Sequence, residues 1–315
     1  WLLAAVVVWW AEAAVVLAAE HRRPAHAAAW LLVLLALPIV GILPFLLARG
    51  KVGLGDSRDR KPAKRSSTGT DDAFPGDERL RRALRRMSDA PITGCNGTEI
   101  LTDGEEAFAS IFDMIGKAEH HIHLAYYILR DDGVGRRFRD ALIRKAKEGV
   151  QVRLIYDGFG SWKLPKSYIR ELTEAGVRVR CFLPLGAALR SRRINHRYHR
   201  KIVIIDGKSG FTGGINIGDE YLGLDKRLGF WRDTHLRVEG DAVCDLQNIF
   251  VRDWELASGE ALYDPAYWPP HACTSHERVQ IVSCGPRLGG NEIYDGLLAA
   301  VGAARERLWI ATPYF

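Results

Sequence analysis

The chain has 315 residues and a formal net charge of +6, from 44 Lys and Arg against 38 Asp and Glu. Apolar residues make up 47% and charged residues 26%, near the average of globular proteins, which excludes wholesale disorder. The five cysteines are widely spaced and include no C-x-x-C pair. This pattern argues against a disulfide framework and against a cysteine zinc site. The first residue is Trp, so we expect the natural N-terminus to be missing.

The first 48 residues are strongly apolar. Residues 27–48 are 22 positions without a charge, and a helix of that length spans roughly 33 Å, enough for a hydrocarbon core of about 30 Å. Residues 1–19 form a second apolar run that only Glu12 interrupts. The pattern predicts a transmembrane helical hairpin over residues 1–48. A signal peptide followed by a buried helix is the less favoured alternative.

Residues 49–97 are predicted to form a basic juxtamembrane linker. Positions 49–86 alone hold 12 Lys and Arg against 6 Asp and Glu. The positive-inside rule therefore places the large C-terminal part in the cytoplasm, where cysteines are reduced. Leu80, Ala83, Leu84 and Met87 recur with a helical period, which predicts an amphipathic helix. That helix either packs on the domain or lies on anionic lipid.

From residue 98 onward, strand-like and helix-like segments alternate. Helices are expected at 134–148, 166–175 and 241–257, and strands are expected at 121–129, 150–157, 177–182, 201–206 and 209–214. This alternation predicts an α/β sandwich around a buried sheet, in a domain over residues 98–270.

A short internal repeat links the two ends of this region. The segment that begins at Gly116 resembles the one that begins at Gly302, with an offset of 186 residues, and each is predicted to be a helix end that runs into an apolar strand. We therefore expect residues 271–315 to be the truncated start of a second, related half.

The segment 195–221 holds the most informative motif. His199, Lys201 and Asp206 have the spacing H-x-K-x4-D, and His199 and Lys201 lie two apart at the start of a predicted strand, so they point to the same face. An imidazole and an ammonium on one face suit a bound phosphate, with Lys as a fixed charge and His as a nucleophile or proton carrier. Gly213 and Gly214 would let the backbone approach an anion closely, and Asn216 offers an amide donor. The alternative is a basic edge strand with a structural histidine.

This segment resembles the signature of the phospholipase D superfamily, and the chain is similar to the bacterial cardiolipin synthases within it. The resemblance extends over EGVQVRLIYDGFGS (148–161), RINHRYHRKIVIIDG (193–207), FTGGINIGDEY (211–221) and FWRDTHLRVEG (230–240). It implies a pseudo-dimer of two α/β halves, each giving one H-K-D set to a shared site. His199 and Lys201 would be the catalytic pair and Asp206 a structural acid. Gly213, Gly214 and Asn216 would contact phosphate, and Asp233 would orient and charge His199.

The resemblance also implies a reaction. One histidine attacks phosphatidylglycerol and forms a phosphohistidine, and a second phosphatidylglycerol then accepts the phosphatidyl group to give cardiolipin. No cofactor or metal is required. The partners would be anionic membrane lipid and the chain's own missing C-terminal half, with a second histidine near position 385. Such a protein would be a multi-pass protein of the bacterial inner membrane with a cytoplasmic catalytic domain.

Three other functions stay open. A phospholipase D would use the same residues with water as acceptor. A membrane-tethered nuclease would use them on nucleic acid, although the apolar N-terminus favours lipid and we expect no nucleic-acid partner. The third is a catalytically inactive membrane scaffold.

Two further histidine clusters have less specific interpretations. His271, Cys273 and His276 sit in PHACTSH, where an exposed loop is favoured over a metal site because no fourth ligand is in range. His121 and His123 share one face of a predicted strand, and we expect a structural role for them.

Overall fold

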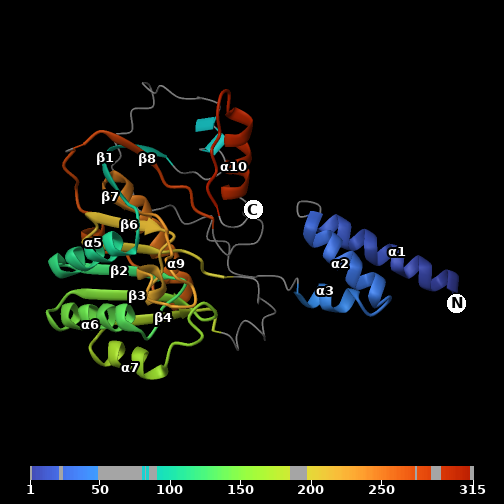
Figure 1. The fold of residues 1–315 in the computed structure, drawn as a ribbon, viewed down its shortest axis with the longest axis horizontal. Coiled ribbons are helices and arrows are strands. Elements are labelled where there is room, and N and C mark those ends of the chain that lie inside the picture. The colour runs from blue at the N-terminus through green and yellow to red at the C-terminus, as the bar shows by residue number, and fades with distance from the viewer. Residues whose placement is uncertain are drawn as a thin grey trace. The chain divides into compact units, whose positions relative to one another are not determined.

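The computed structural model describes residues 2–20, 24–48, 80–81, 83–84, 91–184, 197–273, 275–284 and 292–312. The chain divides into two compact units (Figure 1). One holds the helices of residues 2–48, and the other holds the described residues from 80 onward.

The N-terminal unit consists of α1 (Leu2–Ala19), α2 (Pro24–Ala36) and α3 (Ile42–Ala48). Val16, Leu34 and Phe45 form its small buried core, and the Trp9 indole Nε1 donates a hydrogen bond to the Leu34 carbonyl over 3.1 Å. Among the described residues, no helix has both the length and the apolar character that a bilayer crossing requires.

The apolar run 27–48, predicted as one helix, forms two. α2 ends at Ala36, just before Pro38, which has no N–H to continue the helical hydrogen bonds. Ile39 has a φ of 72°, and a Cβ on Gly41 would lie 2.6 Å from the Leu37 carbonyl oxygen. The chain therefore turns between Leu37 and Gly41 before α3 begins.

An eight-stranded mixed sheet forms the centre of the second unit, with the order β4-β3-β2-β5-β6-β7-β1-β8 (Figure 1). β2, β3 and β4 are parallel, and every other neighbouring pair is antiparallel. The strands are β1 (Ile92–Leu101), β2 (His121–Tyr126), β3 (Gln151–Asp157), β4 (Arg178–Phe182), β5 (Ile202–Ile205), β6 (Ser209–Gly213), β7 (His235–Gly240) and β8 (Glu277–Gln280).

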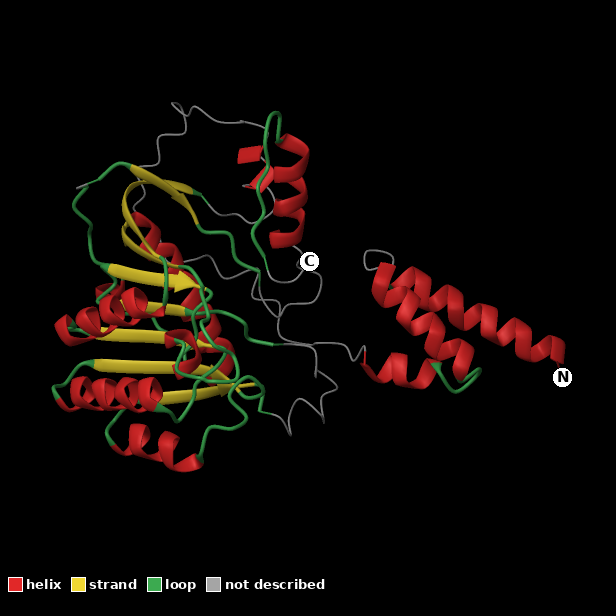
Figure 2. Cartoon of the chain, in the orientation of Figure 1, coloured by secondary structure: helices red, strands yellow, loops and turns green. Residues whose placement is uncertain are grey.

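Helices cover both faces of this sheet (Figure 2). α5 (Gly104–Lys117), α6 (Gly133–Lys147) and α7 (Lys166–Glu174) share one buried core with it, and α9 (Asp241–Ser258) shares another. In β2 the side chains alternate between the two: Leu124 joins the first core, whereas the His123 ring stacks on Phe250 of α9 at 4.5 Å. The predicted α/β sandwich is confirmed.

The buried histidines of β2 have the structural surroundings that the sequence predicted. His123 is hydrogen-bonded to Gln247 of α9 in addition to its stacking on Phe250. Both His121 and His123 are fully buried, and burial lowers the pKa of His121 to about 4. His121 and His123 are therefore packing groups in their neutral form.

Each predicted strand and helix of residues 121–257 is present, although β2 ends three residues early, at Tyr126. The sequence did not predict β1, β7 or β8. α10 (Glu292–Ala303) ends where the repeat predicted a helix end, but residues 304–312 form no strand. They have no strand neighbour among the described residues, and the Trp309 side chain is 86% exposed. Of the predicted amphipathic helix, Leu80, Arg81, Ala83 and Leu84 are helical, and the rest lies outside the described residues.

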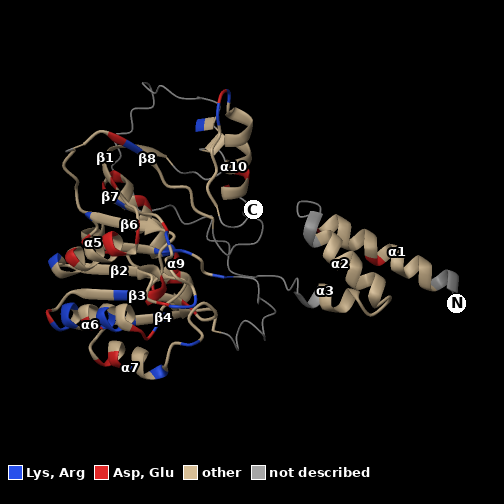
Figure 3. Ribbon diagram, in the orientation of Figure 1, with Lys and Arg blue, Asp and Glu red and all other residues tan. Residues whose placement is uncertain are grey.

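Charged side chains are sparse on the described parts of α1, α2 and α3 and are spread over the second unit (Figure 3). α6 is the clearest example of their placement. Arg144, Lys145 and Lys147 lie in its last turn, where positive charge complements the helix dipole, and Asp132 caps its first turn by accepting from the Gly135 N–H over 2.9 Å.

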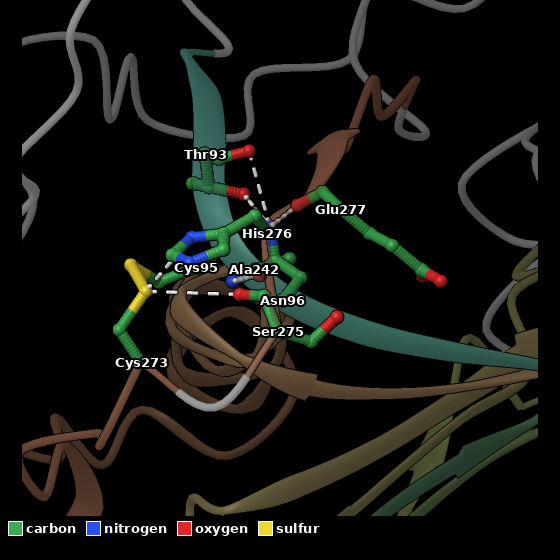
Figure 4. The surroundings of a disulfide bond; sticks show 8 residues. All are labelled: Thr93, Cys95, Asn96, Ala242, Cys273, Ser275, His276 and Glu277. Carbon is green, nitrogen blue, oxygen red and sulfur yellow. Dashed lines mark hydrogen bonds between the residues drawn. A yellow bond between two sulfur atoms is a disulfide. The ribbon is translucent and has the colours of Figure 1, made fainter.

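The expectation that the cysteines form no disulfide is wrong for one pair. Cys95 of β1 is joined to Cys273, 178 residues later, just ahead of β8 (Figure 4). Wide spacing in the sequence gives no information about this pairing, because β8 returns to pair with β1 at the edge of the sheet. Cys181, Cys244 and Cys284 are not disulfide-bonded.

Candidate active site

His199 and Lys201 lie together at the entry to β5, as their spacing predicted. The Lys201 ammonium Nζ is 3.2 Å from His199 Nδ1 and donates to the His199 carbonyl oxygen over 3.0 Å. The His199 side chain is exposed, whereas Lys201 is buried, with 4% of its surface exposed. The pair thus combines an accessible imidazole with a positive charge held largely away from water.

Burial and mutual repulsion set the protonation of this pair. Burial lowers the pKa of Lys201 to about 8, although the Asp233 carboxylate opposes the shift. Burial and the neighbouring Lys201 charge also lower the pKa of His199. At neutral pH the lysine is therefore mostly charged, and the histidine is neutral with a free electron pair.

Tyr198 and Arg200, the residues on either side of His199, point to the opposite side of the chain. Tyr198 donates its hydroxyl proton to Asp253 of α9 over 2.8 Å, and the Arg200 guanidinium also binds this carboxylate. Arg200 further donates to the Cys284 carbonyl oxygen over 2.9 Å. These contacts fix the Tyr198 and Arg200 side chains on the α9 side of the chain. The His199 and Lys201 side chains therefore point to the opposite side.

Asp206 ends β5 and binds the chain at the start of β2. Its carboxylate accepts the backbone N–H groups of Glu119, His120 and His121 at 2.9, 2.8 and 2.8 Å. Its own N–H donates to the His121 carbonyl oxygen over 2.9 Å, and its φ of 53° turns the chain back toward β6. Asp206 therefore binds the backbone beyond the end of β5 that is farther from His199.

Asp157, at the end of β3, is a site residue that the sequence reasoning did not select. Its carboxylate accepts the N–H groups of Phe159 and Gly160, and that of Tyr198 next to His199, each at 2.8 Å. It is also the acid that raises the pKa of His199, against burial and Lys201. The sequence could have indicated Asp157 through its position, because it is an acidic residue at the end of a predicted apolar strand, VQVRLIYD.

The role predicted for Asp233, to orient and charge His199, stays a prediction. The Asp233 carboxylate raises the pKa of Lys201, and the Asp157 carboxylate raises the pKa of His199. Asp157 also accepts the Tyr198 N–H next to His199, whereas Asp233 lies just ahead of β7.

The glycines and Asn216 make contacts within the protein. A Cβ on Gly213 would lie 2.6 Å from His235 Nδ1, and one on Gly214 would overlap the Asp233 carboxylate. The buried Asn216 accepts the Ile128 N–H over 3.1 Å and donates to the Tyr221 hydroxyl. The glycines thus let β7 residues approach β6, and Asn216 fixes the loop after β2. Their contact with a phosphate stays a prediction.

Two further side chains complete the surroundings. The Tyr127 ring, just after β2, lies 4.6 Å from the His199 ring and 5.5 Å from Lys201 Nζ. His235 is buried, and neither of its ring nitrogens has a hydrogen-bond partner among the described residues. Burial and the Lys201 charge lower its pKa to about 4. Tyr127 and Asp157 both follow the carboxyl ends of parallel strands, the edge where α/β sheets commonly bind ligands.

Part of the sequence that forms this site matches a known protein family. Residues 111–254 match the family described as "Cardiolipin synthase, PLD-like domain". Residues 111–254 are therefore a phospholipase-D-like domain.

Curated relatives match over most of the chain. It is 40% identical over 314 residues to a cardiolipin synthase of Halalkalibacterium halodurans and 43% identical over 314 residues to one of Geobacillus kaustophilus. Each match covers 93% of this chain and 61% of the relative, so the chain spans about three fifths of their length. A phosphatidylserine synthase structure from Haemophilus influenzae matches with a TM-score of 0.49 and 16% identity, over 70% of this chain and 57% of that one.

We predict that Asp157→Asn lowers the pKa of His199 further, because it removes the negative charge that stabilises the imidazolium. Asp233→Asn should leave the His199 pKa unchanged and lower the pKa of Lys201 instead. NMR titration of labelled histidine and lysine side chains measures both values. The opposite pattern, in which only Asp233→Asn moves the His199 pKa, would support the role first predicted for Asp233.

Proposed function

We propose that this chain contributes one histidine–lysine pair to a cardiolipin synthase, which transfers a phosphatidyl group from one phosphatidylglycerol to another and releases glycerol. The observation that carries the proposal is the convergence of an exposed neutral imidazole and a buried ammonium, 3.2 Å apart. The names of the relatives, at about 40% identity, support the choice of lipid substrate and of transfer over hydrolysis.

In the first step, His199 attacks the phosphorus of phosphatidylglycerol. A phosphorus–nitrogen bond forms, the bond to the glycerol oxygen breaks, and that oxygen leaves with a proton from a second histidine. The lowered pKa of His199 supports its role as nucleophile, because the attacking imidazole must be neutral. The second histidine would come from a part of the complete gene product outside this sequence.

Lys201 would stabilise the charge that develops on the phosphoryl oxygens. It is charged at neutral pH and already lies next to His199, so little reorganisation is needed when the phosphate binds. The ammonium would exchange its contact with the imidazole for contacts with phosphate oxygens, which frees the imidazole to react.

Three acids would act as positioning residues. Asp206 holds the end of β5 and Asp157 holds the backbone at Tyr198, so both fix the approach to His199. Asp233 keeps Lys201 charged. Gly213, Gly214 and Asn216 would shape the loop that faces the phosphate. In the second step, the second histidine takes the proton from a hydroxyl of another phosphatidylglycerol, whose oxygen attacks the phosphorus. A phosphorus–oxygen bond forms, the phosphorus–nitrogen bond breaks, and His199 is restored.

The N-terminal unit would hold the protein at the inner membrane of a bacterium. Its exposed apolar side chains, each more than 60% exposed, support contact with lipid: Val7, Trp10, Leu32, Leu35 and Val40. The basic residues between positions 49 and 65 support a cytoplasmic location for the catalytic unit, next to anionic lipid.

The proposal predicts the products of the complete gene product in detergent with phosphatidylglycerol. Cardiolipin and glycerol should form, and His199→Ala should lower the rate by at least about 10³-fold without loss of folding, because the nucleophile is gone. His271→Ala, a histidine away from the site, should keep its activity. Phosphatidic acid as the product would indicate a phospholipase D, and no product from folded protein would indicate a scaffold.

The pH dependence of kcat/KM should follow the same two groups. The reaction requires neutral His199, so kcat/KM should decrease as the pH drops below the ordinary histidine pKa of 6.5. It also requires charged Lys201, so kcat/KM should decrease as the pH rises above about 8. In Lys201→Arg the basic limb should move upward, because a guanidinium stays charged. An unchanged basic limb in that variant would show that Lys201 does not supply this charge.

A further inference from the structure

A second cluster of reactive side chains lies at the far edge of the sheet from β4. Cys95 comes from β1, and Cys273 and His276 come from the segment ahead of β8 (Figure 4). His276 Nδ1 lies 3.6 Å from Cys273 Sγ, and the three potential ligand atoms lie within 4.8 Å of one another. The disulfide itself does not need the imidazole, which turns toward the sulfur atoms in Figure 4.

We propose that Cys95, Cys273 and His276 bind a zinc ion when the disulfide is reduced. Two thiolates and an imidazole are the donor set that Zn²⁺ prefers, with water in the fourth position. Zinc–sulfur and zinc–nitrogen bonds of about 2.3 and 2.0 Å at a tetrahedral angle separate sulfur from nitrogen by roughly 3.5 Å. The observed distance of 3.6 Å between His276 Nδ1 and Cys273 Sγ fits this separation.

The protein holds the two segments together without the sulfur–sulfur bond. The buried Asn96, next to Cys95, donates to the Glu277 carbonyl oxygen over 3.0 Å and accepts the Ala242 N–H over 2.7 Å. Thr93 Oγ1 donates to the Val279 carbonyl oxygen over 3.0 Å. The bonds to Glu277 and Val279 link β1 to β8 on either side of Cys95, so the segment that carries Cys273 and His276 stays near Cys95 after reduction.

The conversion between the two states is balanced. An external dithiol gives two electrons and two protons to the disulfide and becomes a disulfide itself, which leaves two free thiols. Zinc then binds as both thiols release their protons. Because reducing compartments keep such cysteines as thiols, the zinc form is the one expected there, and the disulfide is its oxidised counterpart.

This site lies away from the catalytic pair, so the inference does not depend on the proposed function. β1 and β8 are the last two strands of the sheet, and two strands separate β1 from β5 with its catalytic pair. A metal at this edge would clamp the short β8 to β1, in place of the covalent link.

The test measures zinc binding to the reduced full chain by competition with a chromogenic zinc chelator, with Zn²⁺ alone as the probe. We expect one zinc per reduced chain and none per oxidised chain. Cys273→Ser and His276→Ala should each weaken binding by at least about 100-fold, since even groups that only support a ligand contribute 10–100-fold. The matched controls Cys181→Ser and His271→Ala should stay within about threefold.

Co²⁺ in the reduced wild-type chain gives a second readout, independent of whether any variant folds. Thiolate-to-cobalt charge transfer and the visible bands of tetrahedral Co²⁺ should appear and should vanish on oxidation. A reduced chain that binds no metal, or zinc affinity that persists in folded Cys273→Ser and His276→Ala, would overturn the proposal and leave the pair as a disulfide only.

Discussion

The position of His199 and Lys201 depends on the carboxylate of Asp206. It accepts three consecutive backbone N–H groups where the chain enters β2, and its own N–H donates back to the His121 carbonyl oxygen. A charged acceptor that binds three backbone donors is among the stronger local constraints that a protein can form. It fixes the register of β5 against β2, and β5 begins directly after Lys201.

This register also positions β2 and β3, two short strands that end next to His199. β2 ends beside Tyr127, whose ring contacts His199, and β3, parallel to β2, ends at Asp157, which binds the backbone of Tyr198. The imidazole thus lies where three strands meet, and Lys201 beneath it is kept from water. Burial lowers the pKa values of both His199 and Lys201. The Asp157 carboxylate opposes this shift at His199, and the Asp233 carboxylate opposes it at Lys201.

The sequence predicted the parts of this account that have a local signature. Buried apolar runs identified the central strands, and the spacing of His199 and Lys201 placed both on one face. β1, β7 and β8 were missed because their sequences have mixed polarity and β1 pairs with strands that are distant in the sequence. The pairing of Cys95 with Cys273 depends on the same long-range contact. The break at Pro38 was visible in the sequence but was outweighed by continuous hydropathy. Asp157 was missed because its contact with the backbone next to His199 depends on how the strands are ordered, which residue spacing does not reveal.

The proposed reaction requires a covalent bond between His199 and the phosphatidyl group. Mass spectrometry can detect this bond in the complete gene product, quenched rapidly during turnover with phosphatidylglycerol under conditions that preserve phosphohistidine. We predict an acid-labile phosphatidyl adduct on His199 that is absent from His199→Asn. An adduct on a different histidine, or cardiolipin formation with no adduct at any residue, would contradict it.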